Sequence, residues 1–239
     1  MKVALCLSGQ TRNWVASAHT IKKNIIDPLN ADVFFHTWSI RGEKIYDYYP
    51  PDYVIDDTPI IGGLREFYKP VATIIEVPDY EMFKRIHPTP YYNTLMMHYS
   101  IWKANELKKL HEHSNNMKYD LVIRCRFDLE IHKFDIKDTL SNIEDTIYLP
   151  PNINIDVIFS EAMQREFELN GIKYMPNDQL GYGSSEGMDY YSSIWKIEQS
   201  DVNTYMNHPE GAFTDHFWNK NTSKFKVDVN PNILMKIFR

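Results

Sequence analysis

Apolar residues in the first forty positions alternate between the spacing of a strand and that of a helix. Two apolar runs, Lys2 to Leu7 (KVALCL) and Asp32 to Trp38 (DVFFHTW), have the length and composition of buried strands. Between them apolar residues recur every three or four positions, the helical period; they are Trp14, Ala18, Ile21 and Ile25. Pro28 is expected to end this helix. The chain therefore opens with a strand–helix–strand unit, typical of an α/β domain with a parallel sheet.

Further helical and strand-like segments follow along the rest of the chain. The longest helical pattern runs from Asn93 to His111, and shorter helices are expected over 79–87, after Ser184 as far as Gln199, and from Pro209 onward. The remaining strands are expected at Tyr53–Ile55, Ala72–Val77, 119–127, Thr146–Leu149, Asp156–Phe159 and Lys224–Val229. Residues 39–70 otherwise carry Pro and Gly pairs that favour loops. We expect a mostly parallel sheet flanked by helices, in a single domain over residues 1–239.

The composition excludes some classes of protein. The 239 residues are 43% hydrophobic and 24% charged, as in ordinary globular proteins. A formal net charge of −6 argues against a general nucleic-acid binder, which needs a basic face. The two cysteines, Cys6 and Cys125, lie in apolar runs and are expected to be buried, reduced thiols. The sequence carries no apolar run long enough for a secretion signal or a transmembrane segment, so a cytoplasmic location is expected.

The stretch YDLVIRCRFDLEI, from Tyr119 to Ile131, begins as a buried strand and ends in charge. Its four charged residues fall at every second position, which places them on one face of an extended chain; they are Arg124, Arg126, Asp128 and Glu130. Carboxylates spaced in this way can hold Mg²⁺ or Mn²⁺ through oxygen. The arginines can neutralise the carboxylates or grip a phosphate directly. The alternative is a salt-bridged strand with no ligand.

Ser8-Gly9-Gln10-Thr11-Arg12 (SGQTR) is a polar turn between the first strand and the first helix. Backbone N–H groups at a helix start attract anions, and the side chains of Ser8, Thr11 and Arg12 add donors. The turn matches neither a dinucleotide-binding fingerprint nor a phosphate-binding P-loop. It can equally be an ordinary connection between strand and helix.

Two later segments carry candidate bases. Asn177 to Ser185 (NDQLGYGSS) combines two glycines with small polar residues before a helix, and Asp178 is a candidate general base. His208-Pro209-Glu210 suits a helix start, and Glu210 is a second candidate base. A capped turn and a structural helix start are the alternatives.

The four segments in this order resemble those of a group of small glycosyltransferase-like proteins with a GT-A-like fold. The resemblance runs over roughly residues 2–215 through SGQTR, YDLVIRCRFDLEI, NDQLGYGSSEGMDYY and HPEGAF. The group occurs among polysaccharide and lipopolysaccharide synthesis genes, including WavE-type proteins, and in phages and large viruses. Each motif is short, so the ordered set carries the resemblance.

The resemblance implies a Rossmann-like GT-A fold and roles for particular residues. It assigns nucleotide binding to Ser8, Gly9, Gln10, Thr11 and Arg12, metal and diphosphate binding to Asp128 and Glu130, and a place near the acceptor to Asp178, Gln179 and Gly183. Beside these, Arg126 could bind the nucleotide by neutralising its charge, and Tyr182 could bind the acceptor by stacking on a sugar. The usual Asp-x-Asp motif is here Asp-x-Glu after Arg-x-Arg, which leaves the metal requirement open.

The expected activity is transfer of a sugar from a nucleotide-sugar donor to a hydroxyl of a glycan or a lipid-linked acceptor, with no nucleic acid as partner. Mn²⁺ or Mg²⁺ at Asp128 and Glu130, with Arg12, would stabilise the leaving diphosphate. Asp178, or else Glu210, would deprotonate the acceptor if the reaction inverts. The alternatives are a sulfotransferase-like or other nucleotide-dependent group transferase, which would bind without metal, and a non-catalytic carbohydrate-binding protein.

Overall fold

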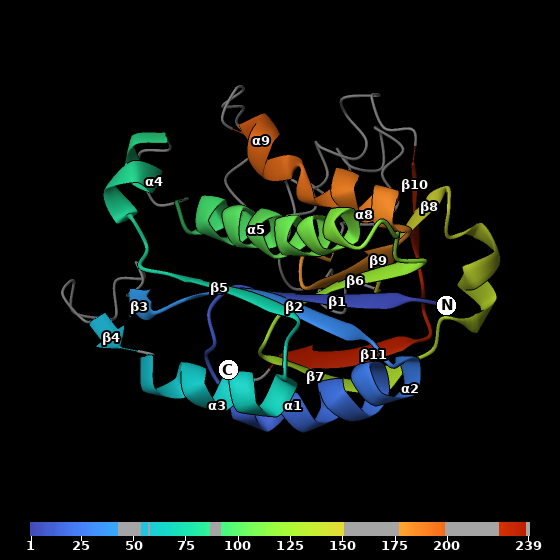
Figure 1. The fold of residues 1–239 in the computed structure, drawn as a ribbon, viewed down its shortest axis with the longest axis horizontal. Coiled ribbons are helices and arrows are strands. Elements are labelled where there is room, and N and C mark those ends of the chain that lie inside the picture. Colours follow the sequence, from blue (N-terminus) through green and yellow to red (C-terminus); the bar gives the residue numbers. More distant parts are fainter. Residues whose placement is uncertain (43–53, 57, 87–91, 151–176, 199–224, 238–239) are drawn as a thin grey trace, which may run out of the picture.

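The computed structural model of the chain describes residues 1–42, 54–56, 58–86, 92–150, 177–198 and 225–237. Its centre is a seven-stranded sheet in the order β10-β8-β9-β6-β1-β2-β5 (Figure 1). The strands are β1 Val3–Ser8, β2 Asp32–Trp38, β5 Ala72–Glu76, β6 Leu121–Cys125, β8 Thr146–Leu149, β9 Leu180–Gly183 and β10 Lys226–Val229. Strand β9 runs antiparallel to both of its neighbours, and the other pairs are parallel. The expected α/β architecture with a mostly parallel sheet is confirmed.

Helices cover both faces of this sheet (Figure 1). They are α1 Trp14–Ile21, continued by a π-helical segment Lys22–Ile26 and by α2 Asp27–Leu29, then α3 Thr58–Tyr68, α4 Tyr80–Ile86, α5 Tyr92–Ser114, a 3₁₀ helix Lys137–Asn142, α8 Ser185–Ser192 and α9 Ile194–Glu198. Figure 1 shows α1, α2 and α3 on one face and α5, α8 and α9 on the other. None of the helices in the described ranges has the length and apolar composition needed to cross a membrane.

Alternation along β1 explains why both faces are buried. Val3, Leu5 and Leu7 pack into the cluster that includes Trp14 and Ile21 of α1. The residues between them, such as Ala4 and Cys6, pack into the cluster that includes Ile101 and Ala104 of α5. A strand covered on both sides is apolar throughout, which is the pattern of parallel sheets.

Two small antiparallel sheets complete the described fold. Strand β7 (Leu129–Phe134) pairs with β11 (Ile233–Ile237), and β3 (Ile40–Gly42) pairs with β4 (Val54–Asp56). The β7–β11 ribbon lies on the same side of the main sheet as α1 (Figure 1), and its residues Leu129, Ile131 and Ile233 join the α1 core cluster. The ribbon therefore extends the core on that face.

Two predicted features in the first seventy residues need correction. Helix α3 occupies part of 39–70, where loops were expected; its Ile61, Leu64 and Tyr68 are buried at helical spacing, and Gly63 brings the helix against Trp14, since a Cβ there would lie 3.4 Å from the indole. The first helix does not stop at Pro28, which lies in the first turn of α2. It ends at Asn30, whose φ of 46° is left-handed.

The strand expected over 119–127 is shorter than predicted, and this changes the candidate site. Strand β6 ends at Cys125, a turn holds Phe127 and Asp128, and β7 begins at Leu129 as part of a different sheet. Phe127 is fully buried in the α1 core cluster, which draws the chain away from the strand direction. The prediction that Arg124, Arg126, Asp128 and Glu130 share one face of a single strand is therefore wrong. The predicted strand Asp156–Phe159 and the helix at Pro209 lie outside the described residues.

Candidate functional site

The order of the strands reverses between β1 and β6. From β1 the chain adds β2 and β5 on one side, and it then returns through α5 to add β6 on the other side of β1. In open α/β sheets, ligands bind in the crevice at the carboxyl ends of the strands where the order reverses. Ser8 ends β1 and Cys125 ends β6, so the polar residues that follow these two strands meet at this position.

Asp128 joins the two strand ends through two arginines. Arg126 donates from Nε to Oδ1 at 2.8 Å and from Nη2 to Oδ2 at 2.7 Å, a two-pronged contact. Arg12, from the loop after β1, donates from Nη1 to Oδ2 at 3.2 Å. The Asp128 side chain is only 1% exposed, whereas Arg126 is 17% and Arg12 47% exposed. A buried carboxylate thus holds two cations that face outward to different degrees.

The pKa values of this group follow from the pairing. Burial alone would raise the pKa of Asp128, but the charge and hydrogen bonds of Arg126, followed by the charge of Arg12, hold it below its usual value. Burial would lower the pKa of Arg126, but the charge and hydrogen bonds of Asp128 and the charge of Asp178 raise it. Asp128 therefore stays ionised and the Arg126 guanidinium stays charged.

Arg124, a residue of β6, also connects the ends of β1 and β6. It is buried, donates from Nε to the Ser8 hydroxyl at 3.2 Å, and donates from Nη1 to the backbone oxygen of Asp178. Arg126 donates its backbone N–H to the oxygen of Gln179 at 3.2 Å. The predicted base Asp178 and the predicted acceptor residue Gln179 thus lie beside the arginines, because β9 pairs antiparallel with β6.

Gly9 is held in place from the protein interior. Its N–H donates to the Ser100 hydroxyl at 2.7 Å, and its carbonyl accepts from the Thr37 hydroxyl at 2.9 Å. Its φ of 108° lies in the region that favours glycine. The N–H expected to face a phosphate therefore points inward, and in this structure Gly9 shapes the loop that carries Arg12.

The sequence did not predict the series of hydrogen-bonded side chains that begins at Gly9. Ser100 Oγ lies 2.7 Å from His36 Nδ1, and His36 Nε2 lies 2.9 Å from Glu76 Oε2. Lys103 Nζ lies 3.3 Å from Glu76 Oε1. A polar residue inside the apolar run DVFFHTW was the available signal, since a buried histidine needs partners.

Burial lowers the pKa of His36, so its ring is neutral. Because Glu76 can only accept, the neutral ring donates from Nε2 to Glu76, and Nδ1 accepts from the Ser100 hydroxyl. The hydrogen bond from His36 lowers the pKa of Glu76 to about 2. These hydrogen bonds therefore all donate in one direction, from the Gly9 N–H to the Glu76 carboxylate, which lies beside Lys103.

Two predicted acceptor residues lie in the core. Tyr182 is fully buried, stacks on Tyr148, and exchanges hydrogen bonds through its hydroxyl with Thr139 at 2.8 Å and Asn230 at 2.7 Å. Gly183 is buried, and a Cβ there would lie 3.4 Å from the Thr146 carbonyl. Both residues are enclosed in the protein interior, because β9 is an inner strand of the sheet.

The other residues predicted to bind nucleotide, metal or acceptor do not contact Asp128 through any hydrogen bond or ion pair described above. Thr11 is buried, and Gln10 accepts from Arg12 Nε at a long 3.5 Å. Glu130 lies on β7, and its Oε2 lies 3.6 Å from Nε2 of His132. Glu210 lies outside the described residues.

The residues at this position do not suit a divalent cation. Both oxygens of Asp128 already accept from guanidinium groups, and Glu130 belongs to another sheet. A cation at Asp128 would lie beside two positive charges, with a repulsion on the order of several kcal/mol. Within the described ranges, no group of three or more His, Cys, Asp or Glu side chains is placed to hold a metal ion.

No protein-family profile matches the chain, and a search of curated proteins found no significant match. The resemblance to glycosyltransferases therefore rests on the ordered motifs alone.

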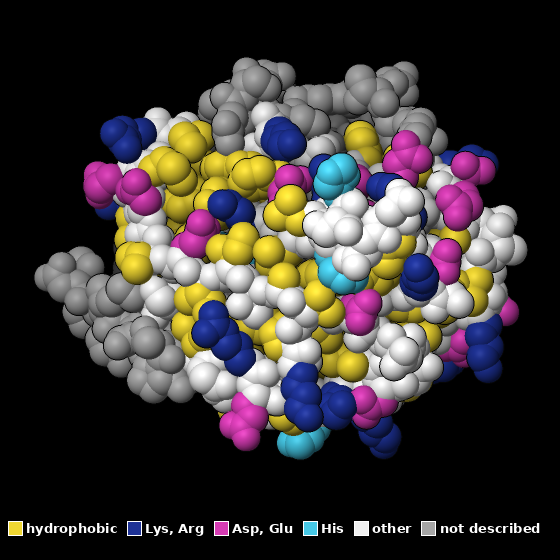
Figure 2. All heavy atoms as spheres, in the orientation of Figure 1, with side chains coloured by type: hydrophobic (Ala, Val, Ile, Leu, Met, Phe, Trp, Pro, Cys, Tyr) yellow, Lys and Arg dark blue, Asp and Glu magenta, His cyan; other side chains and the backbone are white. Residues whose placement is uncertain are grey.

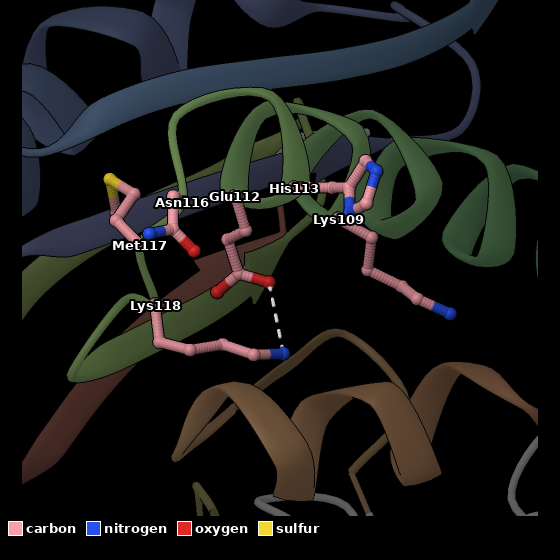
Figure 3. Close-up of a pocket in the computed structure, with 6 residues that line it drawn as sticks. All are labelled: Lys109, Glu112, His113, Asn116, Met117 and Lys118. Carbon is pink, nitrogen blue, oxygen red and sulfur yellow. Dashed lines mark ion pairs between the residues drawn. The ribbon is translucent and has the colours of Figure 1, made fainter.

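A separate pocket of about 520 Å³ lies near the end of α5 (Figure 3). It is lined by Lys109, Glu112, His113, Asn116, Met117 and Lys118. Glu112 and Lys118 point toward each other and lie 3.6 Å apart. Lys118 precedes β6 and Asp128 follows it, so this pocket and Asp128 lie near opposite ends of that strand.

Figure 2 shows hydrophobic side chains gathered over α4 and the nearby part of α5. A cluster rich in aromatic residues, which includes Trp38, Phe83 and Trp195, lies in this part of the molecule. Tyr80, Tyr99 and Trp102 pack against it and are partly buried. The ammonium group of Lys103 lies 5.1 Å from the Tyr99 ring centre and 5.4 Å from that of Trp102. The cluster adjoins the Glu76–Lys103 pair.

Proposed function

We propose that the protein is a glycosyltransferase that takes a sugar from a nucleotide-sugar donor and transfers it to a hydroxyl of a glycan or lipid-linked acceptor. The observation that carries the proposal is the meeting of Arg12 and Arg126 on Asp128, beside Asp178, where the strand order reverses. A mostly parallel sheet with an anion-binding group at this position suits a nucleotide diphosphate.

The arginines have a role in the bond-breaking step. The bond between the sugar's anomeric carbon and a diphosphate oxygen breaks, and the diphosphate leaves with the electron pair. Its growing negative charge is stabilised by the guanidinium groups of Arg12 and Arg126, which Asp128 already holds in position. This positioning is useful because the donors need no reorganisation when the charge develops.

Asp178 has the role of base in an inverting reaction. The acceptor oxygen forms the new bond to the anomeric carbon, and its proton passes to the Asp178 carboxylate. Two observations support this role: Arg124 donates to the backbone oxygen of Asp178, and the charge of the Asp178 carboxylate contributes to the raised pKa of Arg126. Glu210 remains the second candidate base.

One observation favours the second candidate function, a sulfotransferase-like group transferase. Such an enzyme binds its nucleotide without metal, and the two guanidinium groups on Asp128 suit that kind of binding. The donor nucleotide distinguishes the two functions, since a sulfotransferase requires an adenosine 3′,5′-bisphosphate group and a glycosyltransferase a nucleoside diphosphate.

A thermal-shift panel tests the proposal. A ligand that binds only the folded chain raises its melting temperature by mass action. We expect one nucleoside diphosphate, or its sugar, to stabilise the protein, and Arg12→Gln to remove that effect while Arg85→Gln, a change on exposed α4, retains it. Stabilisation by adenosine 3′,5′-bisphosphate alone would favour the second candidate. No response to any nucleotide would contradict both.

A further inference from the structure

We infer that Arg12 and Arg126 form a binding site for a diphosphate group that operates without a divalent cation. The inference rests on the proposed function for its biological role, since that function supplies the nucleotide diphosphate. It departs from the Mn²⁺ or Mg²⁺ site expected from the Asp-x-Glu motif.

The arginines already on Asp128 favour an anion over a metal ion. Both oxygens of Asp128 accept from guanidinium groups, while the Arg126 and Arg12 side chains stay 17% and 47% exposed. A divalent cation here would lie beside two positive charges, whereas a diphosphate would be attracted to them.

Asp128 holds the guanidinium groups of Arg12 and Arg126 in position, which is a different role from that of a metal ligand. Its side chain is 1% exposed, so a solvated ion would reach it only by displacing an arginine. Arg126 is fixed by two short bonds to Asp128, and Arg12 contributes one longer bond at 3.2 Å. Arg12 is also the more exposed of the two arginines, so an incoming anion meets it first.

The backbone conformation of Arg12 also shapes the loop. Its φ of 42° lies in the left-handed region, which a side chain other than glycine adopts at an energetic cost. Two features of the loop hold this conformation, the inward hydrogen bonds of Gly9 and the contact of Arg12 with Asp128. The loop is thus built to present this guanidinium group at the end of β6.

Titration calorimetry with inorganic pyrophosphate tests the inference. We expect saturable binding to the wild-type chain in EDTA, and a loss of affinity of at least about tenfold in Arg12→Gln, as for a lost hydrogen bond to a charged group. Arg85→Gln is the matched control, because it removes an exposed arginine on α4 and should leave the affinity unchanged. Arg12 is half exposed, so its replacement should leave the fold intact, and circular dichroism checks this.

Binding of Mn²⁺ to the protein alone, followed by electron paramagnetic resonance, is the second readout. We expect no stoichiometric Mn²⁺ site that Asp128→Asn removes. The inference is overturned if pyrophosphate fails to bind in EDTA, if Arg12→Gln binds as well as the wild type, or if Asp128→Asn abolishes a stoichiometric Mn²⁺ site.

The outcomes also separate this inference from the proposed function. If nucleoside diphosphates bind only when Mn²⁺ is present, the proposed function stands and the metal-free site is wrong. If pyrophosphate binds in EDTA but no nucleotide binds, the anion site stands and the proposed function is wrong.

Discussion

The backbone N–H of Gly9 donates to the hydroxyl of Ser100 at 2.7 Å, across 91 residues of sequence. Gly9 follows β1 and Ser100 lies in the middle of α5, so this bond ties the candidate ligand loop to the helix that covers the sheet. Ser100 in turn contacts His36, which contacts Glu76. The position of the Arg12 loop thus depends on the ends of three parallel strands and on one helix.

Replacement of Gly9 should disturb this loop. Gly9→Ala should lower the free energy of unfolding by about 1–2 kcal/mol and weaken nucleotide binding, because a φ of 108° is strained for alanine. Open space surrounds the new Cβ, so the effect comes from the backbone. Gly62→Ala is the control. Gly62 occupies an exposed position of helix α3, so this change should be neutral or stabilising by up to about 1 kcal/mol. Equal stability of the two variants would contradict the prediction.

Stability should fall in mild acid because of His36. Its pKa lies below the 6.5 of an unfolded chain, so the unfolded state binds a proton that the folded state does not. The contribution is complete above pH 6.5 and declines as the pH falls below that value. Glu76, with a pKa of about 2 against 4.5, adds a further decline below pH 4.5. Melting temperatures measured from pH 8 to pH 5 should decline less steeply in His36→Gln than in exposed His113→Gln; identical slopes would count against this account.

Asp128 should matter for the fold as well as for the ligand. Asp128→Asn leaves two guanidinium groups without their carboxylate, and removal of one partner of a buried ion pair costs about 3–5 kcal/mol. Chemical denaturation measures the loss, with exposed Asp120→Asn as the control. A change below about 1 kcal/mol would mean that Asp128 does not organise the arginines.

Tyr182 should affect stability without affecting ligands. Tyr182→Phe removes the hydroxyl that contacts Thr139 and Asn230, so it should cost about 1–3 kcal/mol and leave nucleotide and acceptor affinity unchanged. Denaturation and calorimetry on the same variant separate the two effects. A loss of acceptor affinity at unchanged stability would restore the acceptor role that the sequence motif implied.

Local patterns predicted the framework of the fold well. The apolar runs placed β1 and β2, and helical spacing placed most of α5, because these signals depend on neighbouring residues. Helix α3 was missed because Gly62 and Gly63 indicate a loop in sequence, whereas one of them allows close contact with Trp14. The end of β6 was misplaced because Arg126 and Asp128 keep the strand period through a turn that no Gly or Pro marks.

The candidate site was predicted only in part. Arg12, Arg126 and Asp128, which the sequence motifs assigned to one ligand, contact one another in the structure. The motifs did not predict the contact of Ser100 with His36, which depends on where α5 crosses the end of β2. Tyr182 was assigned to the acceptor as a ring that could stack on a sugar, but its place on an inner strand buries it.

The most direct test of the central claim is the release of nucleoside diphosphate from the nucleotide sugar that stabilises the protein, measured with acceptor present and with EDTA added. The account predicts release that continues in EDTA, is lost in Arg12→Gln and Asp178→Asn, and is retained in Arg85→Gln. Release that stops in EDTA would contradict the metal-free site. Absence of release from every donor and acceptor tried would contradict the glycosyltransferase itself.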